Sequence, residues 1–173
     1  MKKIFWVIVL AMIFCPFVIP SYAEEDQVEI RDGVIYFPEK DVPTVVPSKL
    51  TFSFPTDCPQ EILNVKGKVF RGELKYGEAG RRTSTHTSLS YLIPMGYNSD
   101  TKEMAVYYVW GGARSFQGTL KGTLDLANGS VLHLTGSTST TEYRLYFLEK
   151  GKLRINLSNG YSGDYSPVGS LPG

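Results

Sequence analysis

The sequence has few cysteines, few histidines and almost no net charge. Its 173 residues include 2 Cys and 2 His, and 18 Lys and Arg residues offset 17 Asp and Glu residues. So few cysteines do not build a disulfide scaffold, and a neutral chain lacks the basic surface typical of nucleic-acid-binding proteins. The sequence also contains no phosphate-binding loop, dinucleotide fingerprint or nucleophile elbow. We therefore expect no nucleic-acid partner, no cofactor and no enzymatic activity.

Long apolar runs are also scarce, and the clearest one lies at the N-terminus. Lys2 and Lys3 precede eleven apolar residues at 4–14, and the small residues Ser21 and Ala23 follow. The run is shorter than the roughly 20 residues that a helix needs to cross a bilayer. A basic start, a short apolar run and small residues at −3 and −1 are typical of a secretory signal peptide. We predict that residues 1–23 are removed after Ala23 and that the mature protein is periplasmic or secreted, without a transmembrane helix.

Cleavage changes the net charge and the number of cysteines of the chain. It removes two lysines, Cys15 and no acidic residue, so the mature protein has a net charge of −1 and a single cysteine, Cys58. A single cysteine forms no internal disulfide, and the fold must rely on its hydrophobic core. Because free cysteine is among the most buried residue types, we predict that Cys58 is buried, with pairing between two chains as the alternative.

Residues 24–61 form an arm of distinct composition. They hold five of the eight prolines of the mature chain and carry a net charge of −6, whereas residues 62–173 carry +5. Proline lacks a backbone donor, so we expect only short edge strands here, at 34–37 and 50–54. We expect the acidic arm to lie against the basic remainder of the chain, held mainly by apolar contacts of Phe52 and Phe54.

Period-two alternation dominates residues 62–157, which we assign as the body. Along residues 116–126, apolar side chains and glycines alternate with polar side chains, as in a strand with one wet face. Residues 104–110 are apolar on both faces, which indicates a strand covered on both sides. The Asn128-Gly129 pair between two alternating runs indicates a hairpin.

Short connections favour antiparallel neighbours, and closing the sheet removes its exposed edges. The sequence therefore predicts an all-β fold, an antiparallel meander of about eight strands closed into a small barrel. A two-sheet β-sandwich is the alternative, and no substantial helix is expected after the signal peptide. The Gly-, Ser- and Pro-rich residues 158–173 are expected to form a loose tail, in which Tyr161 and Tyr165 can add a last edge strand.

Tyrosine gives the best functional signal, because its apolar ring and polar tip suit binding clefts. We predict a ligand-binding site from residues that are close in the strand pattern: Tyr107, Tyr108, Trp110, Tyr143, Arg144 and Tyr146. The expected function is that of an exported, non-catalytic barrel in the bacterial envelope. Its partner would be a small apolar molecule inside the barrel or a cell-envelope component on a Tyr-rich surface.

Other features leave alternatives open. The hydroxyl-rich runs 83–88 and 135–141 are polar on both faces, and hydroxyl arrays occur in sugar sites as well as on exposed hairpins. Abundant tyrosine also suits an eight-stranded outer-membrane barrel, although the chain lacks a terminal aromatic residue. A third alternative is a hydrolase with a Ser or Thr nucleophile and His86 or His133 as its base. Two histidines are too few for a typical metal site, and we expect none.

Overall fold

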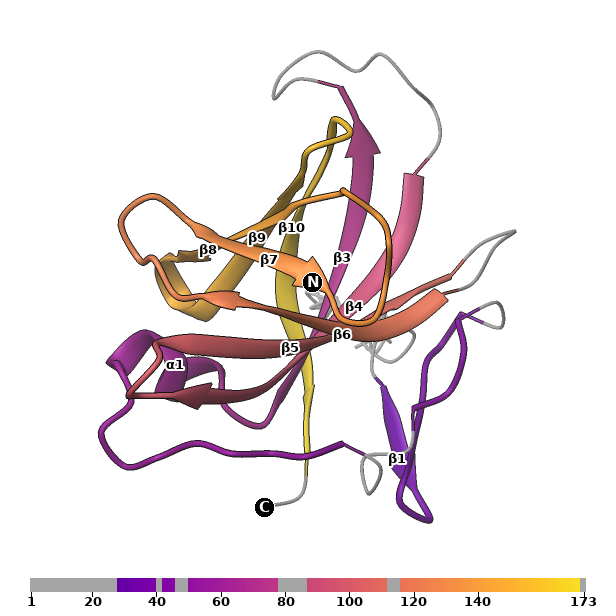
Figure 1. Ribbon diagram of the computed structural model, residues 1–173. Helices are drawn as coiled ribbons and strands as arrows, with labels where there is room; N and C mark the ends of the chain where they lie inside the picture. The colour runs from indigo at the N-terminus through magenta and orange to yellow at the C-terminus, as the bar shows by residue number, and fades with distance from the viewer. Residues whose placement is uncertain (1–27, 40–41, 46–49, 78–86, 112–115, 172–173) are drawn as a thin grey trace, which may run out of the picture.

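The fold is a closed β-barrel (Figure 1). The computed structural model describes residues 28–39, 42–45, 50–77, 87–111 and 116–171. Eight antiparallel strands follow one another around the barrel in the order β10-β3-β4-β5-β6-β7-β8-β9, and β9 pairs again with β10. The predicted all-β barrel is confirmed, and the two-sheet sandwich is wrong. The strands are Lys68–Tyr76 (β3), Thr87–Asn98 (β4), Glu103–Trp110 (β5), Phe116–Thr123 (β6), Ser130–Leu134 (β7), Tyr143–Leu148 (β8), Lys152–Leu157 (β9) and Tyr161–Ser170 (β10).

Successive side chains of each strand point alternately into the barrel interior and to its outer face. In β6, Phe116 and Leu120 pack into the interior, whereas Gln117 and Lys121 are exposed. In β5 both faces are covered, because Tyr108 packs inside while the neighbouring residue Val109 packs on the outside. Each strand from β3 to β9 pairs with the next strand along the chain, as the short connections predicted.

The C-terminal segment does form the last strand expected through Tyr161 and Tyr165, but this strand is part of the barrel and not a loose tail or an edge. Tyr161–Ser170 form β10, which pairs with β3 along most of its length and with β9, and so closes the barrel. Tyr161, Gly163 and Tyr165 occupy alternate, inward positions of β10. The many glycines and serines of this segment make that alternation hard to recognise in the sequence. Glycine is required at 163 because a Cβ atom there would collide with the carbonyl oxygen of Glu73 on β3. Residues that resemble a linker therefore allow a close approach of two strands.

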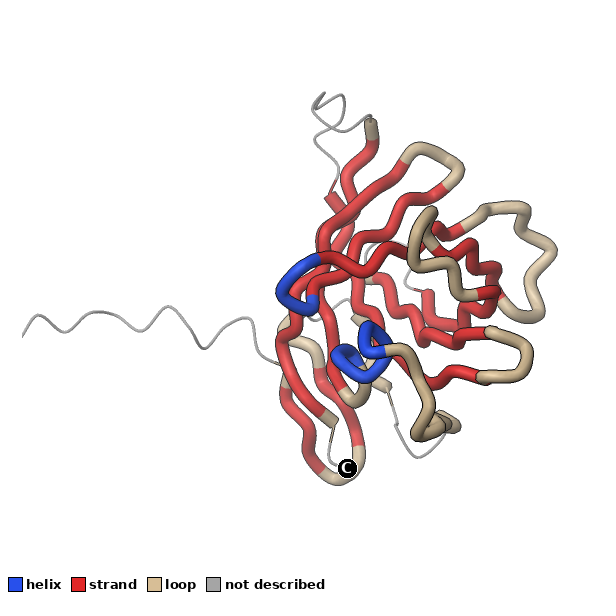
Figure 2. The backbone as a smooth tube through the Cα atoms, turned by 90° about the vertical axis from the view of Figure 1, so that its left-hand side faces the viewer, coloured by secondary structure: helices blue, strands red, loops and turns tan. Residues whose placement is uncertain are grey.

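Helical structure in the described residues is confined to α1, Gln60–Val65, and a 3-10 turn η2, Glu149–Gly151 (Figure 2). Ile62 and Val65 of α1 are each 1% exposed and join the interior cluster next to the start of β3. We call this end of the barrel proximal, and the end where β3, β5, β7 and β9 finish distal. Neither helical segment has the length or apolar content that a membrane span requires.

The arm covers part of the outer face. The hairpin of β1 (Glu29–Arg31) and β2 (Val34–Tyr36) is visible in indigo beside the barrel in Figure 1. Its apolar residues and those that follow pack on outward-facing side chains of β3, β4 and β5. The buried members of this outer cluster are Ile35, Phe37, Val42, Val45, Val69, Tyr91, Ile93 and Val109.

The contacts expected from Phe52 and Phe54 are different in the structure. Phe52 is 38% exposed, and Phe54 packs partly against the interior cluster beside the Lys66 ammonium. Residues 51–54 run past the proximal half of β4, where Ser53 bonds through its backbone to Met95 and Tyr97. Phe52 is not a member of the outer cluster. The expected strand at 50–54 is reduced to a single bridge between Ser53 and Gly96.

One ion pair joins the arm to the body. The Arg71 guanidinium on β3 lies 3.0 Å from the Glu39 carboxylate, and the Tyr91 hydroxyl donates a hydrogen bond to the same carboxylate. Both charged side chains are largely buried, at 24% and 15% exposed. Burial raises the pKa of Tyr91, and the hydrogen bond to Glu39 raises it further. The acidic arm therefore does meet basic residues of the body: Glu39 pairs with Arg71, and Phe54 lies beside Lys66.

Candidate functional site

The six residues predicted to bind a ligand divide between the two faces of the barrel. Tyr108, Trp110 and Tyr143 point inward and pack in or against the interior cluster. Tyr107 packs on the outer cluster beneath the arm, and Arg144 is exposed. Tyr146 also faces outward, with its ring over Gly129. Because successive side chains of a strand alternate, the six residues do not converge on one site.

The three inward residues lie near the distal end, where they meet two residues that sequence reasoning missed, Ser90 and Tyr165. Strand register places Tyr165, Gly72, Ser90, Trp110 and Phe116 side by side in one row across β10, β3, β4, β5 and β6. We call Ser90, Tyr108, Trp110, Tyr143 and Tyr165 the inner cluster. Its members come from four strands, so the cluster exists only because the barrel closes.

A glycine allows the first contact of this row. Gly72 lies between Tyr165 and Ser90, and an added Cβ atom would lie 2.7 Å from the Tyr165 ring. The ring therefore passes over Gly72, and its hydroxyl reaches the Ser90 hydroxyl on β4 at 2.6 Å. Ser90 and Tyr165 are both fully buried, at 0% exposed. This hydrogen bond satisfies both side chains in an otherwise apolar interior.

Two polar atoms of the same cluster are left without a partner. The Tyr108 hydroxyl and the Trp110 indole Nε1 are buried, and neither has a hydrogen-bond partner among the described residues. Ser90, whose hydroxyl is bonded to Tyr165 at 2.6 Å, also acts on the Tyr108 hydroxyl as a side-chain hydrogen-bonding group, but the Ser90 and Tyr108 hydroxyls are not in hydrogen-bond geometry. Both unpartnered atoms belong to β5 and are two positions apart, so they are on the same face of one strand. A buried, unpaired polar group typically costs about 1–3 kcal/mol of stability.

The surroundings of these atoms disfavour negative charge. Burial raises the pKa of Tyr108 well above its ordinary value, and the neighbouring Tyr165 and Tyr143 phenols raise it further, while Ser90 acts in the opposite direction. Burial also raises the pKa of Tyr165 and of Tyr143. The phenols of the inner cluster therefore stay protonated and can donate hydrogen bonds throughout the physiological pH range.

Aromatic rings surround the unpartnered atoms. The Tyr108 ring lies 5.6 Å from the Tyr143 ring and 6.4 Å from the Phe116 ring. Farther toward the distal end, Tyr76 and Tyr161 form an edge-on pair at 5.2 Å. Trp110 and Phe116 are only partly buried, so the cluster is within reach of solvent at this end. The arrangement offers apolar and aromatic surface with a small number of hydrogen-bond donors, which is typical of a small-molecule site.

The remaining candidates from the sequence lie elsewhere. His133 is exposed on β7 opposite Lys121, and His86 lies outside the described residues. Of the hydroxyl-rich runs, 135–141 forms an exposed connection at the distal end, and most of 83–88 also lies outside the described residues. Within the described ranges, no cluster of three or more His, Cys, Asp or Glu residues is suited to a metal ion.

Cys58 is buried, as predicted, beside the proximal interior cluster. Burial raises the pKa of its thiol, the Asp57 charge adds to that effect, and Lys66 opposes it. A thiol whose pKa is raised is a poor nucleophile near neutral pH. Cys58 is therefore a packing residue in this fold.

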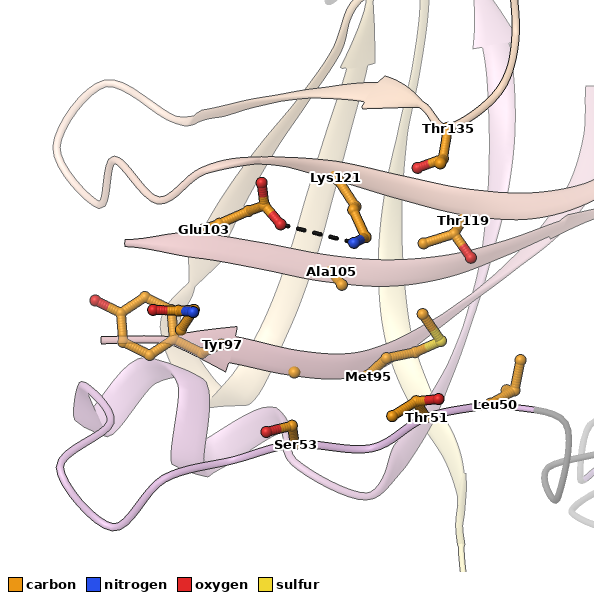
Figure 3. A pocket seen from close by; sticks show the side chains of 12 residues that line it. Leu50, Thr51, Ser53, Met95, Tyr97, Glu103, Ala105, Thr119, Lys121 and Thr135 are labelled. Carbon is orange, nitrogen blue, oxygen red and sulfur yellow. Dashed lines mark ion pairs between the residues drawn. The ribbon is translucent and has the colours of Figure 1, made fainter. Parts of the chain in front are cut away.

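A concave region lies on the outside of the barrel (Figure 3). It is a groove of about 430 Å³ between residues 50–53 of the arm and the outer faces of β4, β5 and β6. On the wall formed by β5 and β6, Glu103 and Lys121 point toward one another and lie 3.7 Å apart, so these two charges are already paired. The groove is lined by Leu50, Thr51, Ser53, Met95, Gly96, Tyr97, Asn98, Glu103, Ala105, Thr119, Lys121 and Thr135. It contains none of the six predicted residues.

No protein-family model, curated protein or solved structure matches the chain. The assignment of a site therefore rests on the geometry of this chain alone. Between the two regions, the inner cluster has buried polar groups that lack partners, whereas the charged groups of the outer groove neutralise one another. We take the inner cluster as the candidate site because its buried polar groups lack partners.

Proposed function

We propose that this chain is an exported, non-catalytic binding protein that holds a small, largely apolar molecule among the inner-cluster residues at the distal end of its barrel. The observation that carries the proposal is the pair of unpartnered polar atoms, Tyr108 Oη and Trp110 Nε1, inside an apolar interior. A bound molecule that accepts hydrogen bonds from both atoms would remove the cost of leaving them unpaired, and this gain would contribute to its binding free energy.

Two further features support this proposal over the alternatives. Outward positions of β6, β8 and β9 carry Lys121, Arg144 and Arg154, while the interior is apolar. A barrel in an outer membrane has the reverse arrangement, with an apolar outer belt and a polar interior. For the hydrolase, His133 lies exposed on the outer face, away from the inner cluster. The export step rests on the signal-peptide pattern at residues 1–23.

Tryptophan fluorescence tests the proposal. The sequence has two tryptophans, so a Trp6→Phe variant leaves Trp110 as the only one, whether or not residues 1–23 are removed. We expect the neutral dye N-phenyl-1-naphthylamine to bind saturably and to accept energy from Trp110. A Trp110→Phe control in the same background should lose the transfer. No saturable transfer in the folded protein would contradict the proposal. An N-terminal sequence beginning at Glu24 in the exported protein would test the cleavage separately.

A further inference from the structure

The unpartnered atoms define the polar part of a complementary ligand. An indole N–H donates a hydrogen bond and cannot accept one, so a group that pairs with Trp110 must be an acceptor. The Tyr108 hydroxyl can donate as well, and its side chain is only 1% exposed. The two residues are two positions apart on the inner face of β5, so a ligand that pairs with both donors must present acceptor oxygen to that face of the strand.

No acceptor of the cluster is in hydrogen-bond geometry with Tyr108 Oη or Trp110 Nε1. The hydroxyls of Ser90 and Tyr165 are bonded to one another at 2.6 Å. Phe116 and Leu134 fill the space beside Gly118, the cross-strand neighbour of Tyr108 on β6. Among the described residues, neither donor is therefore paired in this arrangement of the side chains.

The charge of the ligand follows from the same surroundings. All the polar side chains of the inner cluster are neutral: one serine, three tyrosines and one tryptophan. The nearest cation along β8, Arg144, points to the opposite face of the sheet from Tyr143. A carboxylate would lose its hydration here without gaining a counter-charge, which is unfavourable by several kcal/mol for a buried ion. A neutral acceptor avoids that cost.

We propose that the ligand is a neutral molecule with an aromatic or aliphatic body and a carbonyl-type oxygen, and that this oxygen accepts hydrogen bonds from the Tyr108 hydroxyl and the Trp110 indole N–H. This inference rests on the proposed function, because it names the class of ligand for the same site. Ketones, esters and amides belong to the class, whereas carboxylates, ammonium ions and plain hydrocarbons do not.

Three probes of matched shape separate these classes: 2-acetylnaphthalene carries a neutral carbonyl, 2-isopropylnaphthalene has no acceptor, and 2-naphthoate carries a charge. Affinities are measured by calorimetry on the full-length Trp6→Phe protein. We expect the ketone to bind at least about fivefold more tightly than the hydrocarbon and at least about tenfold more tightly than the carboxylate, since one to two neutral hydrogen bonds account for such ratios. In a two-dimensional ¹H–¹⁵N spectrum, the single indole resonance should move downfield only with the ketone.

Paired variants assign the effect to the two donors. Tyr108→Phe should weaken ketone binding about fivefold and leave hydrocarbon binding within about twofold, since the ring is kept and the hydroxyl is lost. Tyr107→Phe is the matched control, because Tyr107 is the adjacent residue on β5 but packs on the outer cluster. It should change neither affinity. Equal effects of the two variants would overturn the assignment.

The outcomes distinguish the inference from the function on which it rests. If ketone and hydrocarbon bind equally and the indole resonance stays in place, the carbonyl inference is wrong and the binding function stands. That result would also mean that water already satisfies the two donors. Tightest binding of the carboxylate would overturn the inference in favour of an anionic ligand. If none of the three probes binds to the folded protein, both the inference and the proposed function fail.

Discussion

Two substitutions of buried tyrosines by phenylalanine should change stability in opposite directions. Tyr108 and Tyr165 are both almost completely buried, at 1% and 0% exposed, and both belong to the inner cluster. The Tyr165 hydroxyl has a partner in Ser90, whereas the Tyr108 hydroxyl has none among the described residues. Each substitution removes one hydroxyl and keeps the ring, so the two variants differ mainly in the hydrogen bond that is lost.

The magnitudes follow from the cost of buried polar groups. Tyr108→Phe relieves an unmet desolvation cost of about 1–3 kcal/mol, and the small void left by the oxygen offsets part of it, so we expect a gain of about 1 kcal/mol. Tyr165→Phe leaves the Ser90 hydroxyl buried and unpaired, and we expect a loss of about 1–3 kcal/mol. Combining Tyr165→Phe with Ser90→Ala should recover part of that loss, because both partners are then gone.

Urea unfolding and calorimetry measure these differences. For a domain of this size, 1 kcal/mol corresponds to roughly 2–4 °C in Tm. We expect Tm to rise for Tyr108→Phe and to fall for Tyr165→Phe. A loss of stability in Tyr108→Phe as large as in Tyr165→Phe would refute the reasoning, because it would mean that the Tyr108 hydroxyl has a partner in the unliganded protein, such as an ordered water molecule.

Three further predictions concern pH, the arm and the barrel wall. Folding keeps several buried phenols protonated, so their contribution to stability is full below pH about 10 and falls as the pH rises, by about 1.4 kcal/mol per pH unit for each phenol. As the pH is raised from 8 to 12, the urea midpoint should fall less steeply in Tyr108→Phe than in the unsubstituted protein, because one buried phenol is absent. Equal slopes in the two proteins would contradict this prediction. Glu39→Ala should cost about 2 kcal/mol and expose the arm to limited proteolysis, because it removes a largely buried charge partner. The control Glu29→Ala should change stability by less than about 1 kcal/mol, since its ion pair is exposed; equal losses would exclude an anchoring role for Glu39. Gly72→Ala should lower the free energy of unfolding in urea by about 1–3 kcal/mol, because the added methyl group displaces the Tyr165 ring. Unchanged stability would show that the barrel wall accommodates a methyl group beside this ring.

The sequence was sufficient for the architecture because the alternation of apolar and polar residues is local. The run 116–126 and the short turns identify antiparallel strands, and the doubly apolar run 104–110 correctly indicates a strand covered on both faces. The pattern was insufficient for β10, where Gly163 replaces the apolar residue that marks an inward position. The inward position of Gly163 is therefore marked by the close approach of the β10 and β3 backbones, and not by a buried apolar side chain.

The candidate site was predicted in part, for a physical reason that applies to any barrel. Tyr108, Trp110 and Tyr143 do lie together inside, but neighbours such as Tyr107 and Arg144 face outward by the same alternation that identifies the strands. Which of the six residues face inward and which face outward could therefore have been predicted from the sequence. The roles of Ser90 and Tyr165 could not, because they depend on the register between β10, β3 and β4. Register over such sequence separations is fixed by the closed barrel and leaves no local signal.

The most direct test of a ligand site in the inner cluster is the Trp110 indole resonance of the Trp6→Phe protein during titration with 2-acetylnaphthalene. We predict a saturable downfield shift that reports a hydrogen bond to Nε1. The affinity measured from this shift should fall in Tyr108→Phe and stay unchanged in Tyr107→Phe. An indole resonance that stays in place at saturating ketone, in protein whose other resonances show it to be folded, would contradict the account.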